Sequence, residues 1–187
     1  MTLTTPATST DATGPDALDL TAEVRRLRDE REVVDALYRF GAGQDRRDET
    51  LFLSAFALDA ELDFTEPAER FGGDIPVMQG RDVIAGILAT LAPLRTTHTV
   101  TNPRVTLDGD RATLSALVEA QHVRRDDPAR HLLLKNTYDV DLVRDGGSAG
   151  DDDGRWVVRR MVIRNVWSAG DPTVLFGPDA HAPLPEA

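Results

Sequence analysis

Two histidines and one aspartate are the residues of this chain whose types and settings could carry out proton transfer. His98 lies in residues 95–102 (RTTHTVTN) and His122 in residues 118–123 (VEAQHV). Both segments alternate like β-strands, and each histidine shares its face with small or apolar residues, unlike a typical surface histidine. Asp45 stands at the end of an amphipathic helix. One carboxylate and two imidazoles suffice for general acid/base chemistry without a metal or cofactor.

A structural role is the alternative for each of these residues. Most buried imidazoles simply form hydrogen bonds, and an aspartate that follows a helix, here before Arg46, Arg47 and Asp48, is commonly a solvated turn residue. A metal site would suit the same three side chains by ligand type, but no local ligand spacing supports one. His131 and His181 lie in a polar turn and a proline-rich tail, and we assign them no role.

The composition limits the classes of function. A chain of 187 residues, 41% hydrophobic and 5% aromatic, predicts one domain with tails. Its 21 basic and 32 acidic residues give a net charge of -11, which disfavours nucleic acid and anionic membrane as partners. The chain has no cysteine, which excludes disulfides and thiolate chemistry. Without a signal-peptide pattern or a long apolar run, we expect a cytoplasmic protein.

The first half of the chain has the pattern of helices. Residues 1–20 are rich in Thr, Ala and Pro and predict a disordered tail. Beyond them, hydrophobic periodicity and turn residues predict a helix over 21–43, a shorter helix over 49–57, a short strand over 60–64, a loop over 65–79 and a third helix over 80–91.

The second half predicts four strands over 96–107, 111–124, 131–144 and 155–167. Short turns between them indicate an antiparallel meander. Helices followed by a long antiparallel sheet predict an α+β fold, in which a curved sheet encloses a pocket beneath the helices. We expect one domain over 21–168. The tail over 169–187 is either a lid that folds back over the pocket or a frayed end.

The alternation of strand side chains assigns each residue to a face of the sheet. His122 falls on the apolar face of its strand with Leu114 and Val118, and Asn136 and Tyr138 fall on the inward face of the next strand. Buried polar groups need partners, so these residues form either an internal hydrogen-bond network or a functional pocket.

The order of these segments resembles the SnoaL-like and scytalone-dehydratase-like branch of the nuclear-transport-factor-two-like superfamily. The similarity covers about residues 24–167 and includes the passage 56–64 (FALDAELDF), the GRD at 80–82, the THTV at 97–100 and the strand that closes at Trp167. It implies a cone-shaped α+β barrel, in which three helices and a curved antiparallel sheet enclose a pocket. It also implies a homo-dimer or homo-trimer.

In scytalone-dehydratase-like enzymes an aspartate after the first helix orients one histidine, and a second histidine lies across the pocket. Asp45, His98 and His122 fall on these positions. The resemblance therefore implies a cofactor-free elimination of water. His98 would be the general acid/base, Asp45 would hold its tautomer, and His122 would bind or protonate the leaving oxygen.

Two tyrosines that polarise the carbonyl in that dehydratase are replaced here by Gln44 and Phe64. Scytalone itself is therefore not the expected substrate, and the oxyanion donors stay unassigned. The candidate substrate-binding residues are Tyr38, Gln44, Phe64, Asn136, Tyr138 and Asn165.

The sequence thus predicts a dehydratase (lyase) or an isomerase/cyclase that needs neither cofactor nor metal. Its expected substrate is a hydrophobic, oxygenated small molecule such as a polyketide, a steroid or a terpenoid. One alternative is an epoxide hydrolase or cyclase in the same pocket, and another is a non-catalytic ligand-binding or assembly subunit. A distance of more than about 6 Å between Asp45 and both histidines would favour the non-catalytic role.

Overall fold

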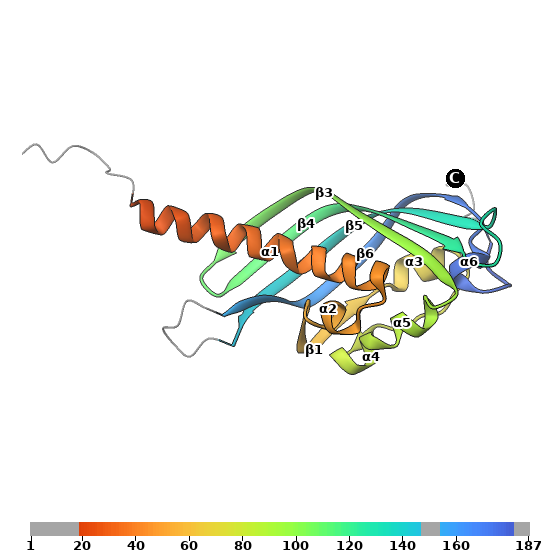
Figure 1. Cartoon of the computed structure of the whole chain (residues 1–187), viewed down its shortest axis with the longest axis horizontal. Helices are drawn as coiled ribbons and strands as arrows, with labels where there is room; N and C mark the ends of the chain where they lie inside the picture. The colour runs from red at the N-terminus through yellow and green to blue at the C-terminus, as the bar shows by residue number, and fades with distance from the viewer. Residues whose placement is uncertain (1–18, 147–153, 182–187) are drawn as a thin grey trace, which may run out of the picture.

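One curved sheet and the helices packed on it make up the structure (Figure 1), a computed structural model that describes residues 19–146 and 154–181. The helices are α1 (Leu20–Arg46), α2 (Glu49–Leu53), α3 (Thr65–Arg70), α4 (Arg81–Ala85), α5 (Ile87–Thr90) and α6 (Thr173–Phe176). The strands are β1 (Phe56–Asp63), β2 (Met78–Gln79), β3 (Leu94–Asp108), β4 (Arg111–Arg124), β5 (His131–Asp145) and β6 (Arg155–Gly170). The predicted α+β class is confirmed.

The sheet has the strand order β2-β1-β6-β5-β4-β3. Strands β3 to β6 form the predicted antiparallel meander. Strand β1 pairs antiparallel with β2 but parallel with β6, so the sheet is not purely antiparallel as expected. Strands β2 to β5 lie between β1 and β6 in the chain, and therefore no hairpin turn fixes the direction of this pair. With β2 and β3 as its edges, the sheet curves without closing.

Helix α1 extends beyond the predicted end and thereby contains Asp45. It begins at the cap Asp19, whose Oδ1 accepts hydrogen bonds from the backbone N–H groups of residues 21 and 22, at 3.0 and 3.2 Å. The predicted end at Gly43 was wrong. Gly43 lies inside the helix, where a Cβ would come 2.5 Å from the backbone of Phe52, so the glycine permits close packing. The helix ends instead at Arg46, and the residue that caps this end, Arg47, has φ 58°.

The shorter elements also differ from the prediction. Helix α2 ends at Leu53, and β1 begins earlier than expected, at Phe56. The predicted loop over 65–79 contains α3 and β2. Just before α3, the Asp63 carboxylate accepts a hydrogen bond of 3.0 Å from the backbone N–H of Thr65, two residues on, which forms a turn. The predicted third helix is interrupted at Gly86, a weak helix former, and becomes α4 and α5. Among the described helices, none is long and apolar enough to cross a membrane.

The C-terminal segment packs against the rest of the fold through α6. Val174 in α6 is buried. The ring of Phe176 stacks on Phe71 at 4.8 Å and on Phe64 at 5.9 Å between centroids. The predicted N-terminal tail lies outside the described residues except for Asp19 and Leu20, and the end of the C-terminal tail, 182–187, lies outside them too.

A buried arginine fixes α1 against the sheet. The Arg39 guanidinium donates a hydrogen bond of 2.7 Å to the carbonyl of Trp156 in β6, another to the carbonyl of Ser54, and one of 2.8 Å to Asp35. These contacts satisfy a charge that is otherwise costly to bury. They also set the distance between α1 and the sheet, and the functional site lies in that space.

Candidate active site

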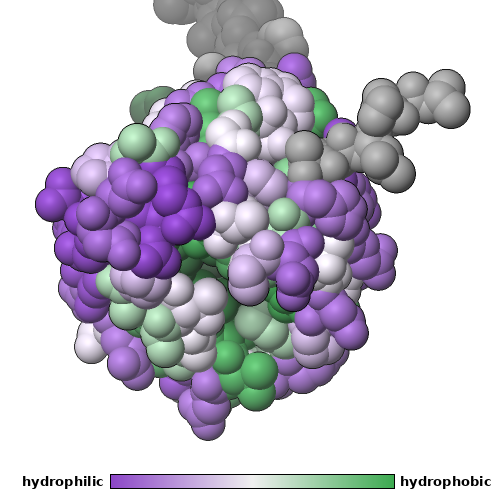
Figure 2. All heavy atoms as spheres, turned by 90° about the vertical axis from the view of Figure 1, so that its right-hand side faces the viewer, coloured by the Kyte–Doolittle hydropathy of each residue, from purple (hydrophilic) through white to green (hydrophobic). Residues whose placement is uncertain are grey.

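A cavity of about 330 Å³ lies between the inner face of the sheet and the helices. This volume is within the range of small-molecule sites. Figure 2, which views the molecule from the end where α6 lies, shows a hollow with hydrophobic surface inside and mainly hydrophilic residues around it. Most lining residues are aliphatic or Phe. The polar side chains on the wall are Gln44, Thr90, His98, His122, Asn136 and Tyr138.

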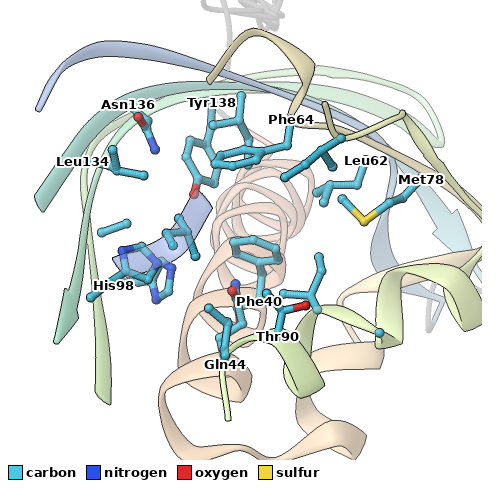
Figure 3. A pocket seen from close by; sticks show the side chains of 18 of the residues that line it. Phe40, Gln44, Leu62, Phe64, Met78, Thr90, His98, Leu134, Asn136 and Tyr138 are labelled. Carbon is cyan, nitrogen blue, oxygen red and sulfur yellow. The ribbon is translucent and has the colours of Figure 1, made fainter. Parts of the chain in front are cut away.

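Asp45 holds His98 by two hydrogen bonds. Oδ1 lies 2.7 Å from Nδ1 of the imidazole, and Oδ2 accepts the backbone N–H of His98 at 2.8 Å. The His98 side chain is only 4% exposed, which leaves the ring little room to turn. Among the described residues, none forms a hydrogen bond to Nε2, and His98 lines the cavity (Figure 3). The contact with Asp45 therefore favours a proton on Nδ1 and a basic Nε2.

The charge state of Asp45 supports this arrangement. Burial by itself would raise the pKa of this carboxyl, but the hydrogen bonds and the charge of His98 outweigh burial. The pKa of Asp45 is lowered as a result. The carboxylate is ionised at neutral pH and accepts both donors of His98.

Helix α1 approaches His98 closely because of one glycine. A Cβ on Gly41 would come 3.0 Å from the Cβ of His98, so the lack of a side chain permits this contact. The neighbouring Phe40 packs edge-on against the imidazole, with 6.1 Å between ring centroids. Asp45 follows Gly41 by one helical turn and reaches the same strand.

The register between β3 and β4 brings the two histidines together. His98 pairs with Ala120 and Thr96 pairs with His122, so the histidines are diagonal neighbours on one face. Their rings lie 6.2 Å apart at 84°. Nδ1 of His122 is buried without a partner among the described residues. Burial, and then the charge of His98, lower the pKa of His122 to about 3, so its imidazole is neutral at neutral pH.

Two asparagines place an amide donor on the cavity wall. The β5–β6 register shifts here, so that Lys135 faces Trp167 and Asn136 faces Asn165. Nδ2 of Asn165 donates to Oδ1 of Asn136 at 2.9 Å and to the carbonyls of Trp167 and Lys135 at 3.1 and 3.4 Å. These three acceptors fix the orientation of both amides. Nδ2 of Asn136 is then turned to the cavity (Figure 3), while Asn165 lies behind it.

Tyr138 supplies a second donor from the same strand. Its ring packs against Phe40 at 6.0 Å, and its hydroxyl points into the cavity on the side of His98 (Figure 3). Burial raises the pKa of this phenol. The hydroxyl therefore stays protonated at neutral pH and can donate a hydrogen bond.

The remaining predicted residues have different positions. Gln44 and Phe64 line the cavity. Tyr38 does not line it: its side chain lies in a surface groove with Pro103 and Val105 and is 50% exposed. The reason is helical geometry, because Phe40 faces the cavity and a residue two positions earlier points about 200° away.

A model of the SnoaL-like domain matches residues 25–162. The chain belongs to the SnoaL-like family. A relative from Penicillium crustosum, terrestric acid biosynthesis cluster protein E, is 33% identical to this SnoaL-like chain over 157 residues, which cover 81% of the chain and 91% of the relative. The family predicted from sequence is thereby confirmed.

Solved structures share the fold of this SnoaL-like protein. An NTF2-like protein with a cystatin-like fold from Novosphingobium aromaticivorans is 19% identical, with a TM-score of 0.59 over 86% of this chain and 95% of that one. Hexachlorocyclohexane dehydrochlorinase LinA-type3 from Novosphingobium barchaimii is 19% identical, with a TM-score of 0.63 over 83% and 99%. At these identities the likeness shows the fold alone.

Several residues that line the SnoaL-like cavity were not singled out from the sequence. Met78 comes from β2, and Val83 and Ile87 come from α4 and α5. The spacing of Val83 and Ile87, four residues apart, is the signal that could have indicated one helical face. Leu175 of α6 also lines the cavity, and the lid role of this segment stays a prediction.

The described cavity wall carries none of the side chains that are ordinarily charged at neutral pH. None of the described lining residues is Lys, Arg, Asp or Glu, and Asp45 lies behind His98. The described part of the chain contains no group of three or more His, Asp or Glu side chains that could hold a metal ion.

Proposed function

We propose that this SnoaL-like protein is a cofactor-independent acid/base enzyme, either a dehydratase or an isomerase/cyclase, that acts on a hydrophobic oxygenated small molecule. The observation that carries the proposal is the double contact of Asp45 with the ring and the backbone of His98. This contact orients the imidazole and leaves Nε2 on the cavity side. An imidazole held in this way is suited to take a proton from a bound substrate.

In the proposed elimination, Nε2 of His98 removes a proton from the carbon next to a substrate carbonyl. The electron pair moves to the carbonyl oxygen and forms an enolate, which accepts hydrogen bonds from the Tyr138 hydroxyl and the Asn136 amide. The enolate then returns its electron pair, the bond to the β-hydroxyl breaks, and the leaving oxygen takes the proton from His98 and departs as water. An isomerase would return that proton to another carbon.

His122 has a narrower role in this scheme than the sequence suggested. With a pKa of about 3, its imidazole carries no extra proton to give at neutral pH. A neutral imidazole still has one N–H donor. We therefore assign His122 to binding the leaving oxygen by a hydrogen bond, while His98 delivers the proton.

The side chains of the cavity wall favour an uncharged substrate that is polar at one end. The polar groups of His98, Asn136 and Tyr138 lie on one side, and Leu62 and Met78 lie on the other (Figure 3). No described lining residue is a cation that could pair with a substrate carboxylate. A neutral polyketide, steroid or terpenoid would place its oxygens near His98 and its carbon skeleton toward Leu62 and Met78. The relative named for terrestric acid biosynthesis supports a role in secondary metabolism.

The same geometry bears on the alternatives. Direct opening of an epoxide by a carboxylate is disfavoured, because no described lining residue is Asp or Glu. Water activated by His98 would be the remaining hydrolytic route. A purely ligand-binding role is disfavoured by the Asp45–His98 distance of 2.7 Å, well below the limit of about 6 Å set above. The cytoplasmic location and the homo-dimer or homo-trimer stay predictions.

The test uses the dialysed full chain and a panel of neutral β-hydroxy carbonyl compounds of polyketide, steroid and terpenoid type. Dehydration is followed by the absorbance of the conjugated product. We expect turnover by the wild type and by the control Tyr38→Phe, whose side chain lies outside the cavity, and a loss of at least about 100-fold in His98→Ala. Turnover retained by a folded His98→Ala variant would overturn the proposal. With an epoxide as substrate, label from ¹⁸O-water in a new hydroxyl group of the product would identify a hydrolase instead.

A further inference from the structure

Arg47 ends α1 in a conformation that a residue with a side chain seldom adopts. Its φ and ψ of 58° and 35° lie in the left-handed region, where helices usually place a glycine. A Cβ is unfavourable there, so the backbone turn alone gives no reason for an arginine. The reason must lie in what the side chain contacts.

The guanidinium of Arg47 joins three segments of the chain: the last turn of α1, the turn after α5 and the start of β3. Its Nη2 donates to the carbonyls of Leu91 and Leu94, at 2.7 and 2.8 Å, and its Nη1 donates to Thr96 Oγ1 at 3.1 Å and to the carbonyl of Gln44. Thr96 is itself buried. A planar fork with several donors suits such a set of acceptors better than an ammonium group.

We propose that Arg47 is a positioning residue for the Asp45–His98 pair. Asp45 lies two residues before Arg47, and His98 lies two residues after the Thr96 hydroxyl that Arg47 binds. Asp45 and His98 are 53 residues apart in the chain, and Arg47 joins α1 to β3 close to the point where they meet. The inference rests on the function proposed above, because it gives Arg47 the task of holding the base in its reactive tautomer.

The experiment measures the tautomer of His98 directly, by proton and nitrogen NMR of the full chain labelled with ¹⁵N-histidine. Arg47→Gly removes the guanidinium and places at this turn the residue that favours a positive φ, so the backbone turn stays favourable. Arg47→Lys keeps the charge but loses the fork. The matched control is Arg125→Ala, because Nε of Arg125 donates to the Leu94 carbonyl at 3.0 Å and, among the described residues, the side chain forms no hydrogen bond to α1.

We expect the wild type and Arg125→Ala to show one His98 tautomer, with a hydrogen-bonded proton on Nδ1. Arg47→Gly should lose this proton signal and show a mixture of tautomers, and Arg47→Lys should weaken it. A signal unchanged in both Arg47 variants would overturn the proposal, as would an equal loss in Arg125→Ala. The measurement needs no substrate. A failure of the proposed function would appear as absent turnover and is therefore distinguishable from a failure of this inference.

Discussion

Replacing His122 by glutamine should flatten the dependence of the free energy of unfolding on pH. The folded protein holds the pKa of His122 at about 3, whereas an unfolded histidine titrates near its ordinary value of about 6.5. At pH values between these two, the His122 side chain binds a proton in the unfolded chain but not in the folded chain. The wild type therefore loses stability as pH falls from about 6.5 toward 3, and a non-titrating residue removes this loss.

The size of the effect follows from the two pKa values. One proton of difference gives a limiting slope of about 1.4 kcal/mol per pH unit. Between pH 7 and pH 4.5, the contribution of His122 to the free energy of unfolding should fall by about 2–3 kcal/mol. Above pH 4.5 Asp45 changes the free energy of unfolding little with pH, since the stability that comes from its lowered pKa is lost only at more acidic pH.

Urea unfolding followed by circular dichroism from pH 7 to pH 4.5 measures this change in the wild type and in His122→Gln. His131→Gln is the matched control, because it makes the same substitution at an exposed histidine outside the cavity. The readout is the slope with pH rather than the absolute stability, which the substitution itself alters. Equal slopes in the wild type and His122→Gln would refute the burial of a neutral His122.

Three further predictions concern single side chains. In Asp45→Asn the amide oxygen should still accept the backbone N–H of His98, so the amide N–H faces Nδ1 and the ring proton moves to Nε2. Turnover should then fall about 10²–10⁴-fold in a folded protein, and an unchanged kcat would contradict this. Tyr138→Phe should lower kcat about 10²–10³-fold with little change in KM if its hydroxyl stabilises the enolate, whereas an effect on KM alone would assign it to ground-state binding. Gly43→Ala should destabilise the protein by about 1–3 kcal/mol, because its Cβ would lie 2.5 Å from the Phe52 backbone; a melting temperature equal to the wild type would contradict that packing.

The part of the site that lies on strands could be predicted from the sequence, because side-chain direction in a strand has a period of two. This period predicted that His122, Asn136 and Tyr138 point inward, and all three are buried and line the cavity. His98 followed in the same way. The proximity of His98 and His122 needed the β3–β4 register, which alternation alone does not give.

The helical half was harder to predict. Tyr38 and Phe40 both belong to the apolar part of α1, and only the packing of α1 on the sheet shows that Phe40 faces the cavity while Tyr38 faces solvent. The contacts of Arg47 with Leu91, Leu94 and Thr96 join residues 44 to 49 positions apart, for which no local pattern exists. The parallel pairing of β1 with β6 is likewise a tertiary feature.

The central claim is that Nε2 of His98, held by Asp45, removes a proton from a carbon next to a carbonyl. Deuterium exchange tests this step alone: neutral carbonyl compounds of the panel are incubated with the protein in D₂O, and incorporation at that carbon is followed by NMR and mass spectrometry. The account predicts exchange catalysed by the wild type, its loss in His98→Ala, and its retention in Tyr38→Phe. Exchange at the wild-type rate in a folded His98→Ala variant would contradict the account.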